Sequence, residues 1–216
     1  MRILLLTLLG LSLIACDKKG SVDSTKERAR AEEEANGEVQ RKILAEKAKK
    51  MEEDLAVRHL FYQAMSGKYE GELVTNDENL RIRITLAPSI PPYFGDRVRE
   101  LSEIEADLSN LYFHAQVVQW HPKSEMSAVG CRISNLRPNI ETGLLTIAST
   151  DCPNLYQVYV GDESSGKSYG DIEKRARELA KDVYTEQLAK VPRLIGVVQP
   201  SSNASIYNFD AQRVGN

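Results

Sequence analysis

Eight consecutive residues, beginning at Gly161 and ending at Ser168, have the spacing of a phosphate-binding loop, G-x-x-x-x-G-K-S, and follow a predicted strand. In such a loop, backbone amides at a helix N-terminus cradle the phosphates, while Lys167 and Ser168 would contact the outer phosphates and magnesium. Here Tyr169-Gly170 separates the motif from the helix that we expect to begin at Asp171, and too few residues follow for the usual parallel sheet. We therefore predict a flexible Gly- and Ser-rich loop and no nucleotide binding.

The other residues that could do chemistry stand alone. Ser164 and Lys167 form an S-x-x-K, but the S-D-N and K-T-G of penicillin-recognising enzymes do not accompany it. His59 lies in a predicted helix and His121 in a predicted turn, without further ligands at metal-binding spacing. We expect no catalytic residue, no metal and no cofactor, and predict that the protein is not an enzyme.

The N-terminal segment is a short apolar run behind a positive charge. Met1-Arg2 precedes thirteen residues, 3–15, interrupted only by Thr, Gly and Ser. A transmembrane helix needs about 20 apolar residues, whereas the hydrophobic region of a secretory signal needs about 7–15. We therefore predict that residues 1–15 are a signal peptide and that the remainder is exported.

This run ends at Leu13-Ile14-Ala15-Cys16, which resembles the lipobox of bacterial lipoproteins. The resemblance covers residues 1–16. It implies cleavage before Cys16, a diacylglycerol on its thiol and often a further acyl chain, and two or three chains anchor a protein durably at ~0.8 kcal/mol per methylene. The expected location is the periplasmic or extracytoplasmic face of a membrane. An Asp directly after the acylated Cys, here Asp17, is typical of lipoproteins that stay in the inner membrane of enteric bacteria. The alternative to a lipobox is an ordinary cleaved signal peptide with a chance Cys at its end.

Cys131 and Cys152 remain in the exported part, where disulfides form. Pairing would close a loop of about 20 residues and stabilise the fold by about 3 kcal/mol. Cys131 shares its strand face with Val129 and Ile133, so the bond is expected on the core side. The alternative is that both cysteines are buried free thiols. A metal site is not expected, because neither cysteine has a second Cys or a His at ligand spacing.

Residues 17–67 carry both signs of charge and no proline. Ser24-Thr25-Lys26-Glu27 fits a capping box and predicts the start of a first helix, which Asn36-Gly37 is expected to break. A second helix is expected from about Glu38 to Ser66, with Gly67 as its C-cap. The apolar stripe of the second helix covers about two heptads, which favours a spacer packed on the body over a coiled-coil oligomer. The predicted segments are an acylated flexible linker at 16–37 and a charged helical tether at 38–67.

After Gly67 the apolar period changes from helical to two, which is typical of half-buried antiparallel strands. Strands are expected at 68–73, 80–86, 104–108, 111–120, 128–134, 143–149 and 155–160, followed by a helix from Asp171 and a hairpin at 193–199 and 204–211. We predict an α+β protein whose body, 68–216, is an antiparallel β barrel or sandwich of about seven strands with a C-terminal helix and hairpin. The sequence Gly67-Lys68-Tyr69-Glu70-Gly71 resembles the opening of lipocalin-like barrels, with Tyr69 where those families usually have Trp.

The strand expected at 111–120 is apolar on both faces. Tyr112, His114 and Trp120 share one face, and Phe113 and Val117 share the other. One face must cover the core. The other meets the C-terminal helix, the end of the tether, or a ligand or partner at a patch centred on Trp120.

The charge balance, 28 Lys and Arg against 31 Asp and Glu, provides no basic field for a nucleic acid. We expect a membrane-anchored cell-envelope lipoprotein whose body is a non-catalytic binding or structural module for an envelope protein or cell-wall partner. The alternative is a lipocalin-like carrier of a small apolar ligand, which requires an interior cavity of several hundred Å³.

Overall fold

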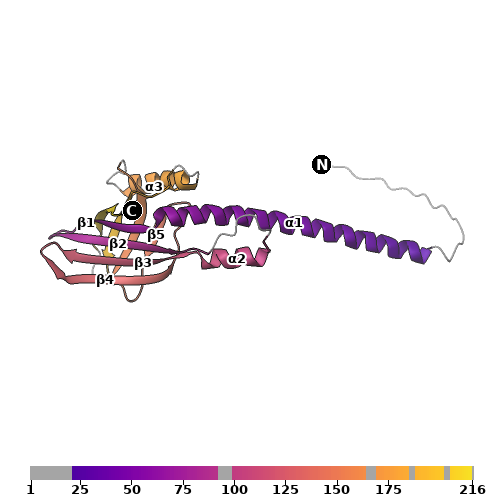
Figure 1. Cartoon of the computed structure of the whole chain (residues 1–216), viewed down its shortest axis with the longest axis horizontal. Coiled ribbons are helices and arrows are strands. Elements are labelled where there is room, and N and C mark those ends of the chain that lie inside the picture. Colours follow the sequence, from indigo (N-terminus) through magenta and orange to yellow (C-terminus); the bar gives the residue numbers. More distant parts are fainter. Residues whose placement is uncertain (1–20, 92–98, 164–168, 185–187, 202–204, 216) are drawn as a thin grey trace, which may run out of the picture. The chain divides into compact units, whose positions relative to one another are not determined.

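The computed structural model describes residues 21–91, 99–163, 169–184, 188–201 and 205–215 (Figure 1). At 21–23, 125–127, 169–170 and 184 the description covers the backbone alone. The chain divides into two compact units, Met1–Glu46 and Lys47–Asn216. The second unit holds the whole β-sheet, so every site considered below lies within it.

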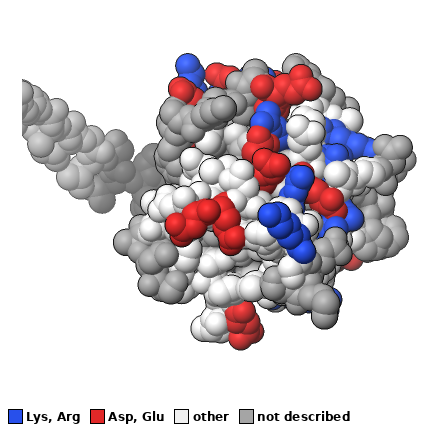
Figure 2. Space-filling model, turned by 90° about the vertical axis from the view of Figure 1, so that its left-hand side faces the viewer, with Lys and Arg blue, Asp and Glu red and all other residues white. Residues whose placement is uncertain are grey.

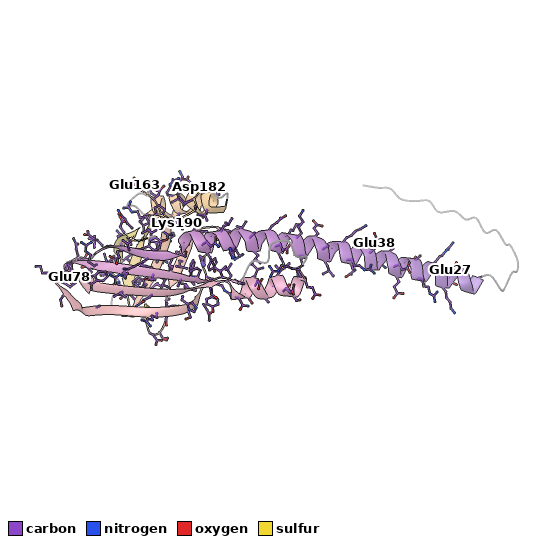
Figure 3. The ribbon with its side chains drawn as sticks, in the orientation of Figure 1. Glu27, Glu38, Glu78, Glu163, Asp182 and Lys190 are labelled. Carbon is purple, nitrogen blue, oxygen red and sulfur yellow. A yellow bond between two sulfur atoms is a disulfide. The ribbon has the colours of Figure 1, made fainter. Side chains whose placement is uncertain are left out.

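The first helix, α1, runs from Ser21 to Met65. The predicted break at Asn36-Gly37 and the flexible linker that would precede it are therefore wrong from Ser21 onward, and Ser24 lies inside the helix rather than at its N-cap. One glycine costs a helix about 1 kcal/mol relative to alanine, and the surrounding Ala, Glu, Arg and Lys favour helix strongly enough to outweigh that cost. Glu27 and Glu38 are exposed along this part of α1 (Figure 3).

Replacing Gly37 by Ala is expected to stabilise this stretch of α1 by about 1 kcal/mol, because alanine loses less backbone entropy in a helix. A Cβ atom at Gly37 would meet nothing within 4 Å, so no clash offsets the gain. Amide hydrogen exchange over residues 33–41 should slow, and the matched variant Ala35→Gly should speed it. Unchanged exchange in both variants would mean that this stretch is not helical in solution.

The body is one antiparallel sheet of eight strands in the order β4-β3-β2-β1-β8-β7-β6-β5. The end strands β4 and β5 approach each other, so the sheet nearly closes into a barrel. The strands are β1 (Gly67–Val74), β2 (Asn79–Ser89), β3 (Tyr112–His121), β4 (Ser124–Leu136), β5 (Leu144–Ile147), β6 (Asn154–Gly161), β7 (Arg193–Pro200) and β8 (Tyr207–Arg213). The α+β class is confirmed. Six of the seven predicted strands are present and the two strands of the C-terminal hairpin join them, so the strand number is eight. The structure is a nearly closed barrel rather than a sandwich.

One predicted strand is a helix. Residues 104–108 lie in α2 (Leu101–Asn110), because Leu101, Ile104 and Leu108 also have the helical spacings of three and four. The Glu103 carboxylate accepts the backbone N–H of Glu100 at 3.3 Å, as in a capping box. Ile104 is fully buried, so the helix turns one apolar side toward the core.

The core fills the inside of the barrel and includes the last turns of α1. Leu55, Phe61 and Met65 are 0–3% exposed and belong to the same apolar cluster as the inward-facing strand residues, which confirms that the end of the tether packs on the body. The Tyr62 ring stacks on Phe113 with ring centroids 4.5 Å apart. The largest fully buried side chains on the strands are Tyr69, Leu73, Ile82, Ile84, Leu86, Phe113, Leu145 and Tyr156.

The third helix, α3, spans Tyr169–Tyr184 and packs on the outside of β6. Ile172 and Ala176 form a second, smaller cluster with Tyr159 and Ile195, which point outward from β6 and β7. The helix begins two residues earlier than the predicted start at Asp171. The C-terminal helix therefore covers the β6–β7 side of the barrel.

Candidate functional site

The outer face of β3 carries the predicted patch. Phe113, Ala115 and Val117 are buried against the core, whereas His114 is exposed and Tyr112 and Trp120 are half-buried on the opposite face. The two helices that could have covered this outer face lie elsewhere. Helix α3 packs on β6, and the end of α1 packs on the core side of β3. Within the described ranges, neither helix covers the face that carries Trp120.

Trp120 lies in a surface with alternating charges. The guanidinium carbon of Arg83, on β2, is 5.1 Å from the centre of the indole ring, a cation–π contact. Arg83 Nε also donates to Glu70 Oε1 at 2.7 Å, and Lys68 Nζ lies 3.0 Å from the same oxygen. Hydrogen bonds from Lys68 and then Arg83 hold the pKa of the Glu70 carboxyl below its usual value, so Glu70 is ionised at neutral pH.

The same mixture of charges continues to the end of the body that carries Glu78, on the left in Figure 3. Figure 2, which looks at that end, shows Lys and Arg side chains interspersed with Asp and Glu rather than gathered into a field of one sign. His121 Nε2 is 3.2 Å from Glu78 Oε2, and Arg81 Nη1 is 3.5 Å from Glu72 Oε1. A partner at this surface would meet both signs of charge.

Tyr112 and His114 form a separate group at the other end of β3. Their rings meet edge to face with centroids 5.1 Å apart, and His114 Nδ1 lies 3.0 Å from Ser134 Oγ on β4. His114 and Trp120 are six positions apart along the strand, which is about 20 Å at 3.4 Å per residue. The structure therefore splits the predicted patch: Tyr112 and His114 lie together, and Trp120 is placed with Arg83.

The pair of Ser134 and His114 has the donor–acceptor distance of a nucleophile and its base, but its surroundings are those of a bulge. Asn135, the next residue, has a positive φ of 61°, and two residues of β4 there oppose one of β3. Both side chains are exposed, so the pair has none of the desolvation that strengthens catalytic electrostatics. We interpret it as a cross-strand hydrogen bond.

Cys131 and Cys152 form the predicted disulfide, with Cα atoms 5.1 Å apart. Cys131 lies opposite the buried Val117, so the bond is on the core side as expected. It joins edge strand β4 to the segment just before β6, where the sheet is not closed by backbone pairing. Gln119 and Asn154 bridge the same opening, because Asn154 Nδ2 donates to Gln119 Oε1 at 3.2 Å.

A cluster around Arg213 was not anticipated from the sequence. Its guanidinium donates to the carbonyls of Ala64 and Ser66 at the end of α1, each at 2.5 Å, and to that of Val191 at 2.8 Å. It also donates to the Tyr69 hydroxyl at 2.7 Å. These residues are far apart in the chain. The antiparallel pairing of β8 with β1, in which Arg213 lies opposite Tyr69, brings Arg213 to the end of α1.

Tyr69 and Gly67 complete this cluster. Burial raises the pKa of the Tyr69 hydroxyl far above its usual value although Arg213 opposes the shift, so Tyr69 stays neutral. Gly67 has φ 146°, and a Cβ atom there would lie 2.5 Å from Arg213 Nη1. The predicted end of the helix near Gly67 is confirmed, and the positive φ favours glycine at this position.

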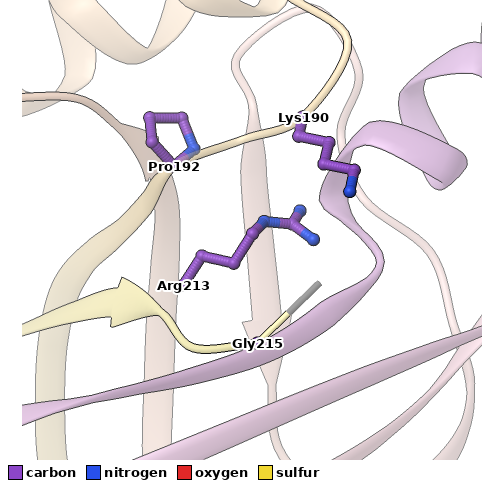
Figure 4. A pocket seen from close by; sticks show the side chains of 4 residues that line it. All are labelled: Lys190, Pro192, Arg213 and Gly215. Atoms are coloured by element: carbon purple, nitrogen blue, oxygen red, sulfur yellow. The ribbon is translucent and has the colours of Figure 1, made fainter.

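Figure 4 shows the cavity beside this cluster, about 500 Å³ in volume and lined by Lys190, Pro192, Arg213 and Gly215. Four hydrogen bonds to protein oxygens occupy the Arg213 guanidinium, which leaves the exposed Lys190 ammonium group as the cation offered to solvent. We interpret the Arg213 cluster as the attachment of α1 to the barrel.

The phosphate-loop motif is described in part. Residues 164–168, with Ser164, Lys167 and Ser168, lie outside the described residues, as do the signal peptide, Cys16 and Asp17. The expected separation between the motif and the helix is wrong, since α3 begins at Tyr169. The sheet around the motif is antiparallel, however, and Asp162 is held by Arg175 Nη2 at 2.6 Å, with Arg193 donating to its carbonyl at 3.2 Å.

In the described part of the chain, no three His, Cys, Asp or Glu side chains lie close enough together to hold a metal ion. Among the same residues, no helix combines the length and the apolarity needed to cross a membrane. No protein-family model, curated protein or solved structure matches this chain.

Proposed function

We propose that this protein is a lipoprotein of the bacterial cell envelope, anchored by acyl chains on Cys16, and that its β body is a non-catalytic module that binds another envelope protein. The lipobox-like sequence Leu13-Ile14-Ala15-Cys16 carries the first half of the proposal. The half-buried Trp120 beside Arg83, on a sheet face that α3 leaves bare, carries the second.

The chemistry of this face favours a protein partner. Trp and Arg are enriched among the residues that contribute most to binding at protein interfaces, and a fixed aromatic ring offers a large contact area at low entropic cost. Glu70 holds Arg83 over the indole, so the ring and the guanidinium are already positioned before binding. Small molecules prefer concave sites, whereas the outer face of a sheet suits a broad contact.

Site-specific photo-crosslinking in cells tests the proposed face. A photo-reactive amino acid at Val118, which neighbours Arg83 across the strands, is expected to give a discrete adduct with one envelope protein. The same amino acid at the exposed Lys174 on α3 is the control and should not give it. Trp120→Ala should reduce the Val118 adduct about tenfold or more. Identical adducts from both positions, or full retention in Trp120→Ala, would contradict the proposed face.

The interior of the barrel supports a surface module more than a carrier. Tyr69, Phe113 and Tyr156 point inward, are at most 1% exposed, and pack in one continuous cluster with Phe61 and Met65 of α1. A carrier would instead release co-purified lipid on extraction and take up an apolar fluorescent probe in a saturable manner. We expect neither from the purified protein.

A further inference from the structure

A second recess lies between α1, α2 and the end of β4, on elements other than those around Trp120. It encloses about 330 Å³, at the lower end of the range for small-ligand sites, and we call it the arginine groove. Arg58 and Tyr62 line it from α1, Leu108 from α2, and Leu111 and Arg137 from the two ends of the β3–β4 hairpin. Residues 47–65 of α1 and α2 lie side by side here (Figure 1), and Lys47 Nζ is 3.5 Å from Glu105 Oε1.

Two guanidinium groups line the groove, and each has N–H groups that donate to no described residue. Arg58 donates through Nε to Asp54 Oδ2 at 2.8 Å, and Arg137 donates through Nη2 to the Ser109 carbonyl at 2.5 Å. Among the hydrogen bonds between described residues, these are the ones that the two side chains make, while a guanidinium carries five N–H groups. Several N–H donors are therefore available to an acceptor in the groove.

Both arginines act on the same hydroxyl. The Tyr62 O–H donates to the Leu111 carbonyl at 3.2 Å, and burial, the largest influence, raises its pKa to about 12. The positive charges of Arg137 and Arg58 each oppose that rise, which means that both are close enough to the hydroxyl to affect it. Tyr62 and the two arginines line the same recess.

The charges limit what can bind. Arg58 and Arg137 supply two positive charges and Asp54 one negative charge, so the groove balances a single negative charge. A carboxylate has that charge, and its two oxygens match the fork of a guanidinium. A phosphate dianion carries an additional charge, which Asp54 would repel. Leu108, Leu111 and the Tyr62 ring form an apolar wall for the carbon skeleton of the ligand.

The geometry points to the arginine groove as a binding site for a monocarboxylate with an apolar side group, such as the carboxyl end of a peptide. Arg137 and Arg58 bind the two carboxylate oxygens, and Leu108 and Leu111 contact the side group. This inference goes beyond the proposed partner at Trp120 and uses different residues, so either can fail without the other.

Titration of the isotope-labelled full chain with N-acetyl-leucine, followed by NMR, tests the site. N-acetyl-leucinamide has the same shape without the charge and is the matched ligand control. We expect saturable shifts around Tyr62 and Leu111 with the acid and none with the amide. Arg58→Gln and Arg137→Gln should each weaken binding about tenfold, the loss typical of one charge-assisted hydrogen bond.

Arg132→Gln is the matched protein control, because Arg132 is an exposed arginine on β4 outside the groove, and it should bind like the wild type. Spectra of each variant without ligand establish that it folds, and Arg137→Lys, which keeps the charge, should retain part of the affinity. Equal binding of acid and amide, absence of saturation, or equal affinity in Arg137→Gln and Arg132→Gln would overturn the proposal. Tighter binding of inorganic phosphate than of the acid would overturn its selectivity for a single charge.

Discussion

Replacing Arg213 by Ala is expected to lower the free energy of unfolding by about 3–5 kcal/mol. The guanidinium donates to three backbone carbonyls, two of them at the end of α1, and to the buried Tyr69 hydroxyl. Alanine leaves the three carbonyls and the buried Tyr69 hydroxyl without these donors. It also removes the positive charge that balances the negative end of the helix dipole.

Urea unfolding monitored by circular dichroism measures this loss. Arg213→Lys keeps the charge but not the planar fork, so its stability should fall between those of Arg213→Ala and the wild type. Arg132→Ala removes an exposed arginine and should change stability by less than about 0.5 kcal/mol. If Arg213→Ala unfolded at the same urea concentration as Arg132→Ala, the cluster would not be what attaches α1 to the barrel.

Removing the disulfide is expected to cost about 3 kcal/mol, because a cross-link between residues 21 apart restricts the unfolded chain. In the folded protein the bond also closes the side of the barrel where β4 and β5 do not pair. The double variant Cys131→Ser, Cys152→Ser and the reduced wild type should therefore unfold at similar, lower urea concentrations.

The double variant also controls for the reductant itself, since reductant should leave its unfolding midpoint unchanged. Amide exchange should quicken most in β4, whose outer edge loses its covalent link to the segment before β6. Equal midpoints for oxidised and reduced wild type would show that the bond does not constrain the fold.

The regular parts of the fold could be predicted because their signals are local. Alternation of apolar residues identified β1, β2, β3 and β6, since a strand with one buried face must show a period of two. The same rule failed at Ile104, Ala106 and Leu108, because Ile104 and Leu108 are four residues apart and also fit one face of a helix. In the structure Ala106 is exposed. Asn36-Gly37 predicted a turn, but the structure has a continuous helix there, because the helix-forming residues around the pair outweigh its turn preference.

The sites depend on contacts between distant residues, and there the sequence was less informative. The disulfide could be predicted because lipidation of Cys16 would leave only two cysteines to pair. Arg213 lies 147 residues from Ser66, so no local pattern could indicate their hydrogen bond. Tyr112, His114 and Trp120 were correctly placed on one face, but a shared face does not bring together residues at opposite ends of a strand.

Mass spectrometry of the protein purified from bacterial membranes tests the proposal that Cys16 is the acylated first residue of the mature protein. Residues 1–15 should be absent, and the N-terminal peptide should start at Cys16 with a diacylglycerol on sulfur, with or without an acyl chain on nitrogen. Cys16→Ser should abolish both the modification and the membrane association. An unmodified Cys16 thiol, or an intact peptide that still contains residues 1–15, would contradict the account.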